Sequence, residues 1–237
     1  MAEIPPPSAA GPFLPQLLPK RLLNGYASFR AGRFAREQER FRHLALAGQT
    51  PRILLIGCCD SRVSPEVIFD AAPGELFVVR NIANLVPPYG PNDDLHGTSA
   101  ALEFAVMGLG VEHIVVMGHA GCGGIRAFAR GETATGHNPL SPGDFIGKWI
   151  SLIGPAAAQA GPANASEDYF ERLELASIKQ GLANLRSFPW IAAREQEEKL
   201  ALHGAYFGIA NGNLLALEEH TGGFVPVASA AAGEAGA

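Results

Sequence analysis

The sequence predicts an α/β fold: a mostly parallel β-sheet flanked by helices, with its last strand antiparallel. Continuous apolar runs, typical of strands buried on both faces, occur at 52–57, 76–79 and 113–117. A helical stretch at 95–109 lies between the second and third runs and completes a β-α-β unit. Two later strands, 200–209 and 214–218, are joined across Asn211-Gly212, a pair that tolerates the positive φ of a hairpin turn.

Two helical stretches come before the first strand. Residues 13–34 carry apolar side chains at roughly helical spacing, and Pro19 predicts a break near that position. Residues 34–47 are heavily charged on one side, and Gly48-Gln49-Thr50-Pro51 ends this second stretch.

The other helices are expected around and after the third strand. Gly97-Thr98-Ser99 opens the helix at 95–109 as a cap. A short helix at 122–130 is followed by a Gly- and Pro-rich connection at 131–142 and by two further helical stretches, 143–160 and 167–188.

Length and composition indicate one domain over 1–237, with flexible ends at 1–11 and 228–237. The formal net charge of −5 argues against a nucleic-acid partner, because such partners select for positive charge. The chain does not open on a basic segment followed by an apolar one, and no window is long enough to cross a membrane. We therefore expect a cytoplasmic protein without a membrane partner.

Cys58, His119 and Cys122 form a candidate metal site. Three cysteines, two of them adjacent, do not make a disulfide framework, so metal binding is the more economical interpretation. Both segments directly follow predicted strands, and ligands bind at the C-terminal edge of open α/β sheets. Two thiolates and one imidazole suit Zn²⁺ and leave one of its four tetrahedral positions open. An open position predicts catalysis.

Asp60 and Arg62 accompany the first ligand. Because alternate side chains of an extended segment share a face, Cys58, Asp60 and Arg62 are expected to point into one crevice. Asp60 would compete for the open metal position unless Arg62 held it elsewhere by bidentate hydrogen bonds. We therefore hypothesise that Asp60 orients a zinc-bound hydroxide and that activity rises toward alkaline pH.

The motifs resemble those of the β-class carbonic anhydrases. The resemblance rests on Cys58-x-Asp60-x-Arg62, on His119-x-x-Cys122-Gly-Gly, and on the run from Gly74 to Asn84. It implies zinc-dependent reversible hydration of CO₂ to bicarbonate and a proton by zinc-bound hydroxide, with one Zn²⁺ per subunit. Cys58, His119 and Cys122 then take the ligand positions, and Asp60 and Arg62 the catalytic ones.

The same resemblance assigns further parts of the chain. Gln49 matches a substrate-orienting glutamine, and backbone N–H groups around Gly123 and Gly124 would face a bicarbonate oxygen. The family fold implies four parallel strands plus an antiparallel edge strand, and an N-terminal helical arm, here 12–47, wrapped over a partner subunit. The expected assembly is a homodimer or a tetramer built as a dimer of dimers.

A plant-like subtype without bicarbonate inhibition is favoured within that family. Some relatives are inhibited at a second site lined by a tryptophan, an arginine and a tyrosine. The corresponding positions here are Leu55, Arg80 and Phe207, so two of the three side chains are missing.

Some residues and motifs near the candidate metal site have a second interpretation. Cys59 is expected to face away from Cys58 as a small buried residue, and Arg80 to stabilise a loop or interface. The glycine-rich segment 118–124 lacks the spacing of a nucleotide-binding loop. Two other functions stay open from sequence: hydrolysis of COS or CS₂ on the same scaffold, and a non-catalytic module that senses zinc or bicarbonate.

Overall fold

The structure is a computed structural model that describes residues 18–92, 95–131, 140–162 and 167–227. The ends predicted to be flexible, 1–11 and 228–237, lie outside the described residues. The chain divides after Gly48 into two units, which are described separately. Nearly all of the chemistry expected from the sequence lies in the second unit.

The first unit consists of two helices, α1 (Lys20–Ala31) and α2 (Arg33–Ala47). Pro19 occupies the N-cap position of α1, so the helix predicted over 13–34 begins only at Lys20. The rings of Phe29, Phe34 and Phe41 pack within 5.3–5.8 Å of one another. Neither helix has a buried residue, so within one chain the apolar side chains of both remain largely uncovered.

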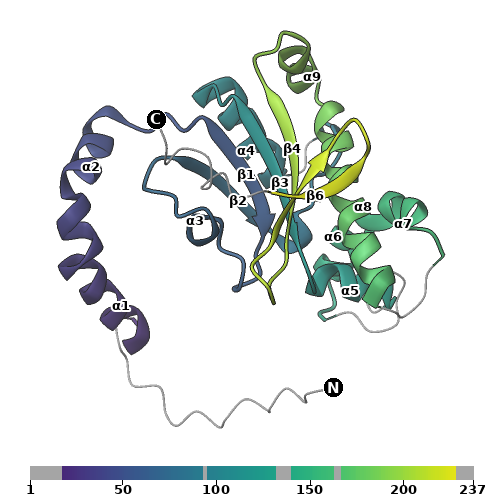
Figure 1. Ribbon diagram of the computed structural model, residues 1–237, viewed down its shortest axis with the longest axis horizontal. Helices are drawn as coiled ribbons and strands as arrows, with labels where there is room; N and C mark the ends of the chain where they lie inside the picture. The colour runs from purple at the N-terminus through teal and green to yellow at the C-terminus, as the bar shows by residue number, and fades with distance from the viewer. Residues whose placement is uncertain (1–17, 93–94, 132–139, 163–166, 228–237) are drawn as a thin grey trace, which may run out of the picture. The chain divides into compact units, whose positions relative to one another are not determined.

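The second unit is built on a six-stranded sheet of order β2-β1-β3-β4-β5-β6 (Figure 1). Its first four strands in that order are parallel, as predicted, and the last two are antiparallel. The sixth strand was not expected, because its four residues begin with glycine and end with proline. The strands are β1 (Ile53–Cys58), β2 (Leu76–Asn81), β3 (His113–His119), β4 (Ala201–Phe207), β5 (Leu214–Glu218) and β6 (Gly223–Pro226).

Helices fill the connections. Their bounds are α3 (Pro65–Ile68), α4 (Gly97–Glu103), α5 (Gly123–Ala129), α6 (Phe145–Ile150), α7 (Gly154–Ala160), α8 (Glu167–Arg186) and α9 (Pro189–Gln196). Single 3₁₀ turns occur at Ile82–Asn84 and Ser151–Ile153, and a π-helix at Phe104–Leu109.

Three helix predictions need correction. The helix expected at 95–109 becomes a π-helix at Phe104, and its N-cap residue is His96, which makes no side-chain capping bond. The stretch at 143–160 is interrupted, because a 3₁₀ turn leads into Gly154 and α7 restarts there with proline in its first turn. α9 was not predicted, although Pro189 at its first turn is a start signal for a helix.

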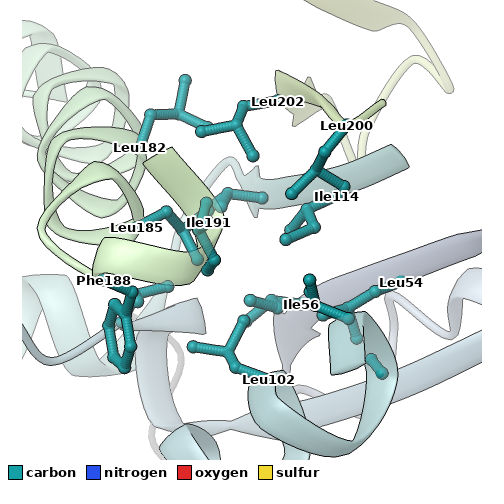
Figure 2. Close-up of a cluster of buried hydrophobic side chains, with 14 of the residues drawn as sticks. Leu54, Ile56, Leu102, Ile114, Leu182, Leu185, Phe188, Ile191, Leu200 and Leu202 are labelled. Carbon is teal, nitrogen blue, oxygen red and sulfur yellow. The ribbon is translucent and has the colours of Figure 1, made fainter. Parts of the chain in front are cut away.

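The main core lies between one face of the sheet and helices α4, α8 and α9 (Figure 2). Leu54 and Ile56 of β1 and Ile114 of β3 are fully buried there against Leu102 and Leu185. On the opposite face the cluster of buried residues is small, formed by Leu55, Met117 and Ala205. The described helices therefore cover the two faces of the sheet unequally.

Helix α8 lies unusually close to the sheet. Ile178 fits over Gly118 of β3 and Gly204 of β4, and a Cβ at these glycines would come within 2.8 Å and 3.0 Å of the Ile178 side chain. Any larger residue at either strand position would push the helix outward. The absence of side chains at these two glycines therefore determines how closely α8 approaches the sheet.

Candidate metal centre

β1 and β3 are adjacent parallel strands that end at the same edge of the sheet. Cys58 is the last residue of β1 and His119 the last of β3, while Cys122 caps α5 three residues later. The ligand atoms of these three side chains lie within 4.8 Å of one another. The adjacency of these two parallel strands is thus what brings the three together.

The three side chains fit a zinc ion. All are buried, and His119 Nδ1 lies 3.0 Å from the Ala120 carbonyl oxygen, which favours the tautomer with the proton on Nδ1. Nε2 is then left with a lone pair, and this buried atom has no hydrogen-bond partner. A buried, unpartnered imidazole nitrogen beside two thiols is the donor set that Zn²⁺ takes. Three protein ligands leave a fourth position for solvent or substrate.

The two thiols are electrostatically unequal. The hydrogen bond between the two thiols lowers the pKa of Cys58, although burial of this thiol opposes the fall. The same thiol pair, together with burial, raises the pKa of Cys122, although N–H groups of Ile125 and Gly124 oppose the rise. Both thiols must lose their protons to bind a dication, so metal binding at this site would release protons.

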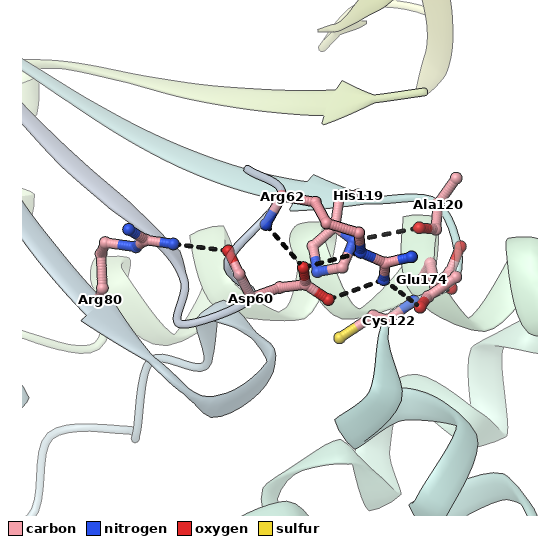
Figure 3. A network of polar contacts seen from close by, with 8 residues as sticks. Asp60, Arg62, Arg80, His119, Ala120, Cys122 and Glu174 are labelled. Carbon is pink, nitrogen blue, oxygen red and sulfur yellow. Dashed lines mark hydrogen bonds and ion pairs between the residues drawn. The ribbon is translucent and has the colours of Figure 1, made fainter. Parts of the chain in front are cut away.

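Asp60 is held by Arg62, as predicted (Figure 3). The backbone N–H and Nε of Arg62 donate to Oδ1 at 3.0 and 2.9 Å, and Nη2 donates to Oδ2 at 2.7 Å. These bonds hold the pKa of Asp60 well below its usual range, so this carboxyl stays ionised. Strand alternation was expected to place Asp60 and Arg62 on one side, and this expectation was wrong. The strand ends at Cys58, the chain turns at residues 61–62, and the Val63 N–H donates to the Asp60 carbonyl oxygen.

Arg80 fixes the backbone that carries Cys58 and Asp60. From β2, its Nε donates to the Cys58 carbonyl at 2.8 Å and its Nη2 to the Asp60 carbonyl at 2.6 Å. This is the loop-stabilising role expected of Arg80. The next residue, Asn81, adds a backbone bond from the Cys59 N–H and a side-chain bridge to Leu85, a role that the sequence did not reveal.

Glu174 is a site residue that sequence reasoning missed. It is 3% exposed and lies on α8, where Oε1 accepts the Cys122 N–H at 2.9 Å and Oε2 accepts the Tyr206 hydroxyl at 2.8 Å. Burial raises its pKa, and the bonds from Tyr206 and Cys122 oppose that rise. An acidic residue flanked by Leu173 and Leu175 in an otherwise apolar helix stretch was the available signal.

The remaining candidate residues lie as follows. Gln49 is exposed and precedes β1, so the six residues of that strand, about 20 Å, separate it from Cys58 of the same chain. Gly123 and Gly124 open α5 beside Cys122, which is the N-cap residue of that helix. Cys59 is not among the three grouped ligands, and it is exposed where a buried residue was expected.

The positions of the second bicarbonate site are occupied in other ways. Leu55 is buried in the small cluster on the sheet face opposite the main core, and Arg80 is engaged with the Cys58 and Asp60 carbonyls. Phe207, at the end of β4, packs partly buried against the cluster that contains Cys58 and Cys122. Absence of bicarbonate inhibition stays a prediction.

No helix in the described part of the chain is both long and apolar enough to span a membrane. This finding concerns helices alone.

Comparisons with known proteins agree on one family. The carbonic anhydrase family profile matches residues 53–214. Beta carbonic anhydrase 5, chloroplastic, of Arabidopsis thaliana is 39% identical over 195 residues, which cover 78% of this chain and 60% of that protein. The chain thus spans less than two thirds of this plant relative, whose similarity is consistent with the plant-like subtype.

Solved structures give the same result. The β-carbonic anhydrase CcaA superposes with a TM-score of 0.76 at 32% identity, covering 89% of this chain and 92% of that one. A structure from a study of two tetrameric β-carbonic anhydrases of the ascomycete Sordaria macrospora gives 0.70 at 29% identity, covering 88% and 98%. With the profile, the plant relative and these folds in agreement, the chain belongs to the β-carbonic anhydrase family.

Proposed function

We propose that this protein catalyses the reversible hydration of CO₂ to bicarbonate and a proton. The observation that carries the proposal is the Asp60 carboxylate, held by three donors of Arg62 beside a three-ligand metal site. A site that only bound zinc for structure would close the fourth position with another ligand. Because Arg62 keeps Asp60 away from the fourth metal position, that position is available to a substrate.

The division of labour follows from the geometry. Cys58, His119 and Cys122 would hold a zinc ion, which when bound supplies a Lewis acid that acidifies a water molecule. The Asp60 carboxylate accepts a hydrogen bond from the attacking oxygen and so directs its lone pair toward CO₂. Because its pKa is held low, Asp60 orients this oxygen and does not take up the proton at neutral pH. Arg62 keeps Asp60 away from the metal.

Gln49, Gly123 and Gly124 are proposed to bind the substrate. Gly123 and Gly124 lie at the N-terminus of α5 beside Cys122, where backbone N–H groups favour an anion such as bicarbonate. Gln49 lies at the far end of β1, so it can serve only the site of a second copy of the chain. This placement makes the Gln49 role depend on assembly.

The proposed assembly is a homodimer or a dimer of dimers, formed by a single-domain chain. Helices α1 and α2 bury none of their own residues and expose Leu22, Leu23 and Tyr26, as an arm that covers a partner subunit would. The Sordaria macrospora relatives are described as tetrameric. A cytoplasmic location is also proposed, and cell fractionation with detection of the full-length chain tests it.

Stopped-flow CO₂ hydration tests the activity. Purified zinc-loaded protein should accelerate hydration, and Asp60→Ala at equal zinc content should lose about 100-fold in kcat/KM, because the attacking oxygen is no longer oriented. No turnover in the zinc-loaded wild-type protein contradicts the proposal. Neither COS or CS₂ hydrolysis nor a sensing role is favoured by the site or by the family.

A further inference from the structure

The buried contact between α8 and the metal loop has no part in the function proposed so far. Glu174 accepts the Cys122 N–H at 2.9 Å with one carboxylate oxygen and the Tyr206 hydroxyl at 2.8 Å with the other. Figure 3 shows Glu174 reaching the backbone at Cys122. Both residues of α8 and β4 are nearly inaccessible, at 3% for Glu174 and 6% for Tyr206. A buried carboxylate is costly unless its hydrogen bonds serve the structure around it.

The position of Glu174 follows from the packing of α8. Ile178 lies one helical turn after Glu174, so the two side chains share a face of the helix. Ile178 is seated over Gly118 and Gly204, where a Cβ would clash with it. This close approach holds the helix at a depth from which the Glu174 carboxylate reaches Cys122. Tyr206, two residues after Gly204 on the same face of β4, then meets the second oxygen.

The Cys122 backbone needs such a partner. Cys122 is the N-cap of α5, with φ −65° and ψ 120°, so its own N–H takes no part in the helix. Its carbonyl oxygen accepts the Arg126 N–H at 3.0 Å, a bond of the first turn of α5. The bond to Glu174 therefore fixes the N–H of Cys122, which takes no part in the hydrogen bonds of α5. With its N–H and its carbonyl both fixed, the direction of Sγ toward Cys58 and His119 is determined.

We propose that Glu174, itself held in place by Tyr206, is a positioning residue that orients Cys122 for metal binding. The inference rests on the metal site of the proposed function and adds to it the groups that determine its affinity. Partners of metal ligands typically change affinity by about 10- to 100-fold when removed. Glu174 acts through the Cys122 backbone and does not contact the metal.

Zinc affinity of the full-length protein, measured by competition with a chelator, tests the proposal without CO₂ turnover. Glu174→Ala should weaken zinc binding by about 10-fold or more and shift the thiolate-to-metal absorption of the cobalt-substituted protein. Glu174→Gln should restore most of the affinity, because its amide can accept from Cys122 and donate to the Tyr206 oxygen. Tyr206→Phe should give a smaller loss. Glu171→Ala removes an exposed carboxylate from the same helix and should match the wild type.

The outcomes separate this inference from the function. A wild-type protein that binds no zinc contradicts the metal site itself. Wild-type zinc affinity in folded Glu174→Ala, or a Glu174→Gln variant as weak as the alanine variant, overturns the positioning role. Circular dichroism and thermal unfolding show which variants are folded; if Glu174→Ala is not, the glutamine and phenylalanine variants decide, and wild-type affinity in Tyr206→Phe then counts against the proposal.

Discussion

At the scale of single residues, the site depends on side chains whose freedom is removed by charged partners. Arg62 uses three donors on Asp60, and Arg80 uses two on the carbonyls of Cys58 and Asp60. Arg62 therefore fixes the Asp60 carboxylate, while Arg80 fixes the backbone that carries both Asp60 and the ligand Cys58. Substitution of Arg62 and substitution of Arg80 should therefore have different effects.

Arg62→Ala should lower catalysis without loss of zinc. Freed from the guanidinium, Asp60 has a pKa nearer its ordinary value and can turn toward the metal. We expect kcat/KM for CO₂ hydration to fall about 10- to 100-fold while zinc content stays stoichiometric. The kcat/KM of Arg62→Lys should lie between those of the wild type and Arg62→Ala, because an ammonium cannot make the bidentate contact. Unchanged kcat/KM in Arg62→Ala counts against the guard role.

Arg80→Ala should lower stability. Two bonds from a partly buried guanidinium to loop carbonyls are lost, and we expect the free energy of unfolding to fall by about 2–4 kcal/mol. Urea titration followed by circular dichroism measures this change. Lys199→Ala removes an exposed ion pair to Glu197 and should leave the free energy of unfolding almost unchanged. Equal effects of the two substitutions are the result that opposes this account of Arg80.

The pH dependence of CO₂ hydration should rise from mildly acidic to alkaline conditions. The pKa of Asp60 is depressed by Arg62, so Asp60 is already ionised throughout that range and contributes no limb to the profile. The rise then belongs to ionisation of the attacking water, so Asp60→Asn should lower the amplitude and keep the profile's shape. Stopped-flow rates at constant ionic strength measure the profile, and a flat one argues against this mechanism.

At the scale of elements, the metal site is assembled by strand order and by helix depth. Adjacent β1 and β3 bring Cys58 to His119, and the glycines under α8 bring Glu174 to Cys122. A parallel sheet was predictable from the continuous apolar runs, although the predicted β-α-β unit joins β2 and β3, between which β1 lies in the sheet. How closely α8 approaches the sheet could not be predicted, because Glu174 contacts residues that lie 52 and 32 positions away in the sequence.

The sequence predicted the ligands better than their supports. Soft donors at the ends of two strands identify Cys58, His119 and Cys122 by their chemistry, and a carboxylate two residues before an arginine identifies the guard pair. Asn81 and Glu174 gave no such pattern, since an amide and a carboxylate acquire their roles only from the backbone groups that the fold brings near them. β6 was missed because its four residues begin with glycine and end with proline, and α9 was missed although Pro189 is a start signal for a helix.

Gly204→Ala tests helix depth directly. Its Cβ would lie 3.0 Å from both Ile178 and Leu217, so α8 or β5 must move. We expect a loss of about 1–3 kcal/mol in the free energy of unfolding, together with weaker zinc binding. Gly154→Ala, at a helical position with nothing within 4 Å, should cost nothing. A Gly204→Ala protein as stable as the wild type means that α8 is not limited at this glycine.

At the scale of the whole molecule, two features favour the proposed association with a second copy of the chain. Helices α1 and α2 contain no buried residue, and Gln49, which is proposed to bind the substrate, is separated by β1 from Cys58 of its own chain. Both facts have one explanation if a second copy supplies the missing surfaces. Assembly and activity are then linked.

Charged substitutions on α1 should dissociate the oligomer. Leu22 and Tyr26 are 56% and 62% exposed and lie four residues apart, on one face of the helix. The double variant Leu22→Glu, Tyr26→Glu should shift the mass measured by light scattering from a dimer or tetramer to a monomer, with loss of CO₂ hydration. Glu197→Ala, on the surface of the second unit, should leave the mass unchanged. A monomeric wild-type protein with full activity opposes this prediction.

The coordination of zinc tests the central claim most directly. A crystal structure of the zinc-loaded protein at neutral or alkaline pH should show the ion bound by Cys58 Sγ, His119 Nε2 and Cys122 Sγ. Its fourth position should be open to solvent, and both Asp60 oxygens should remain on Arg62. Zinc coordinated by the Asp60 carboxylate with Arg62 turned away, or zinc held by any other set of side chains, contradicts the account.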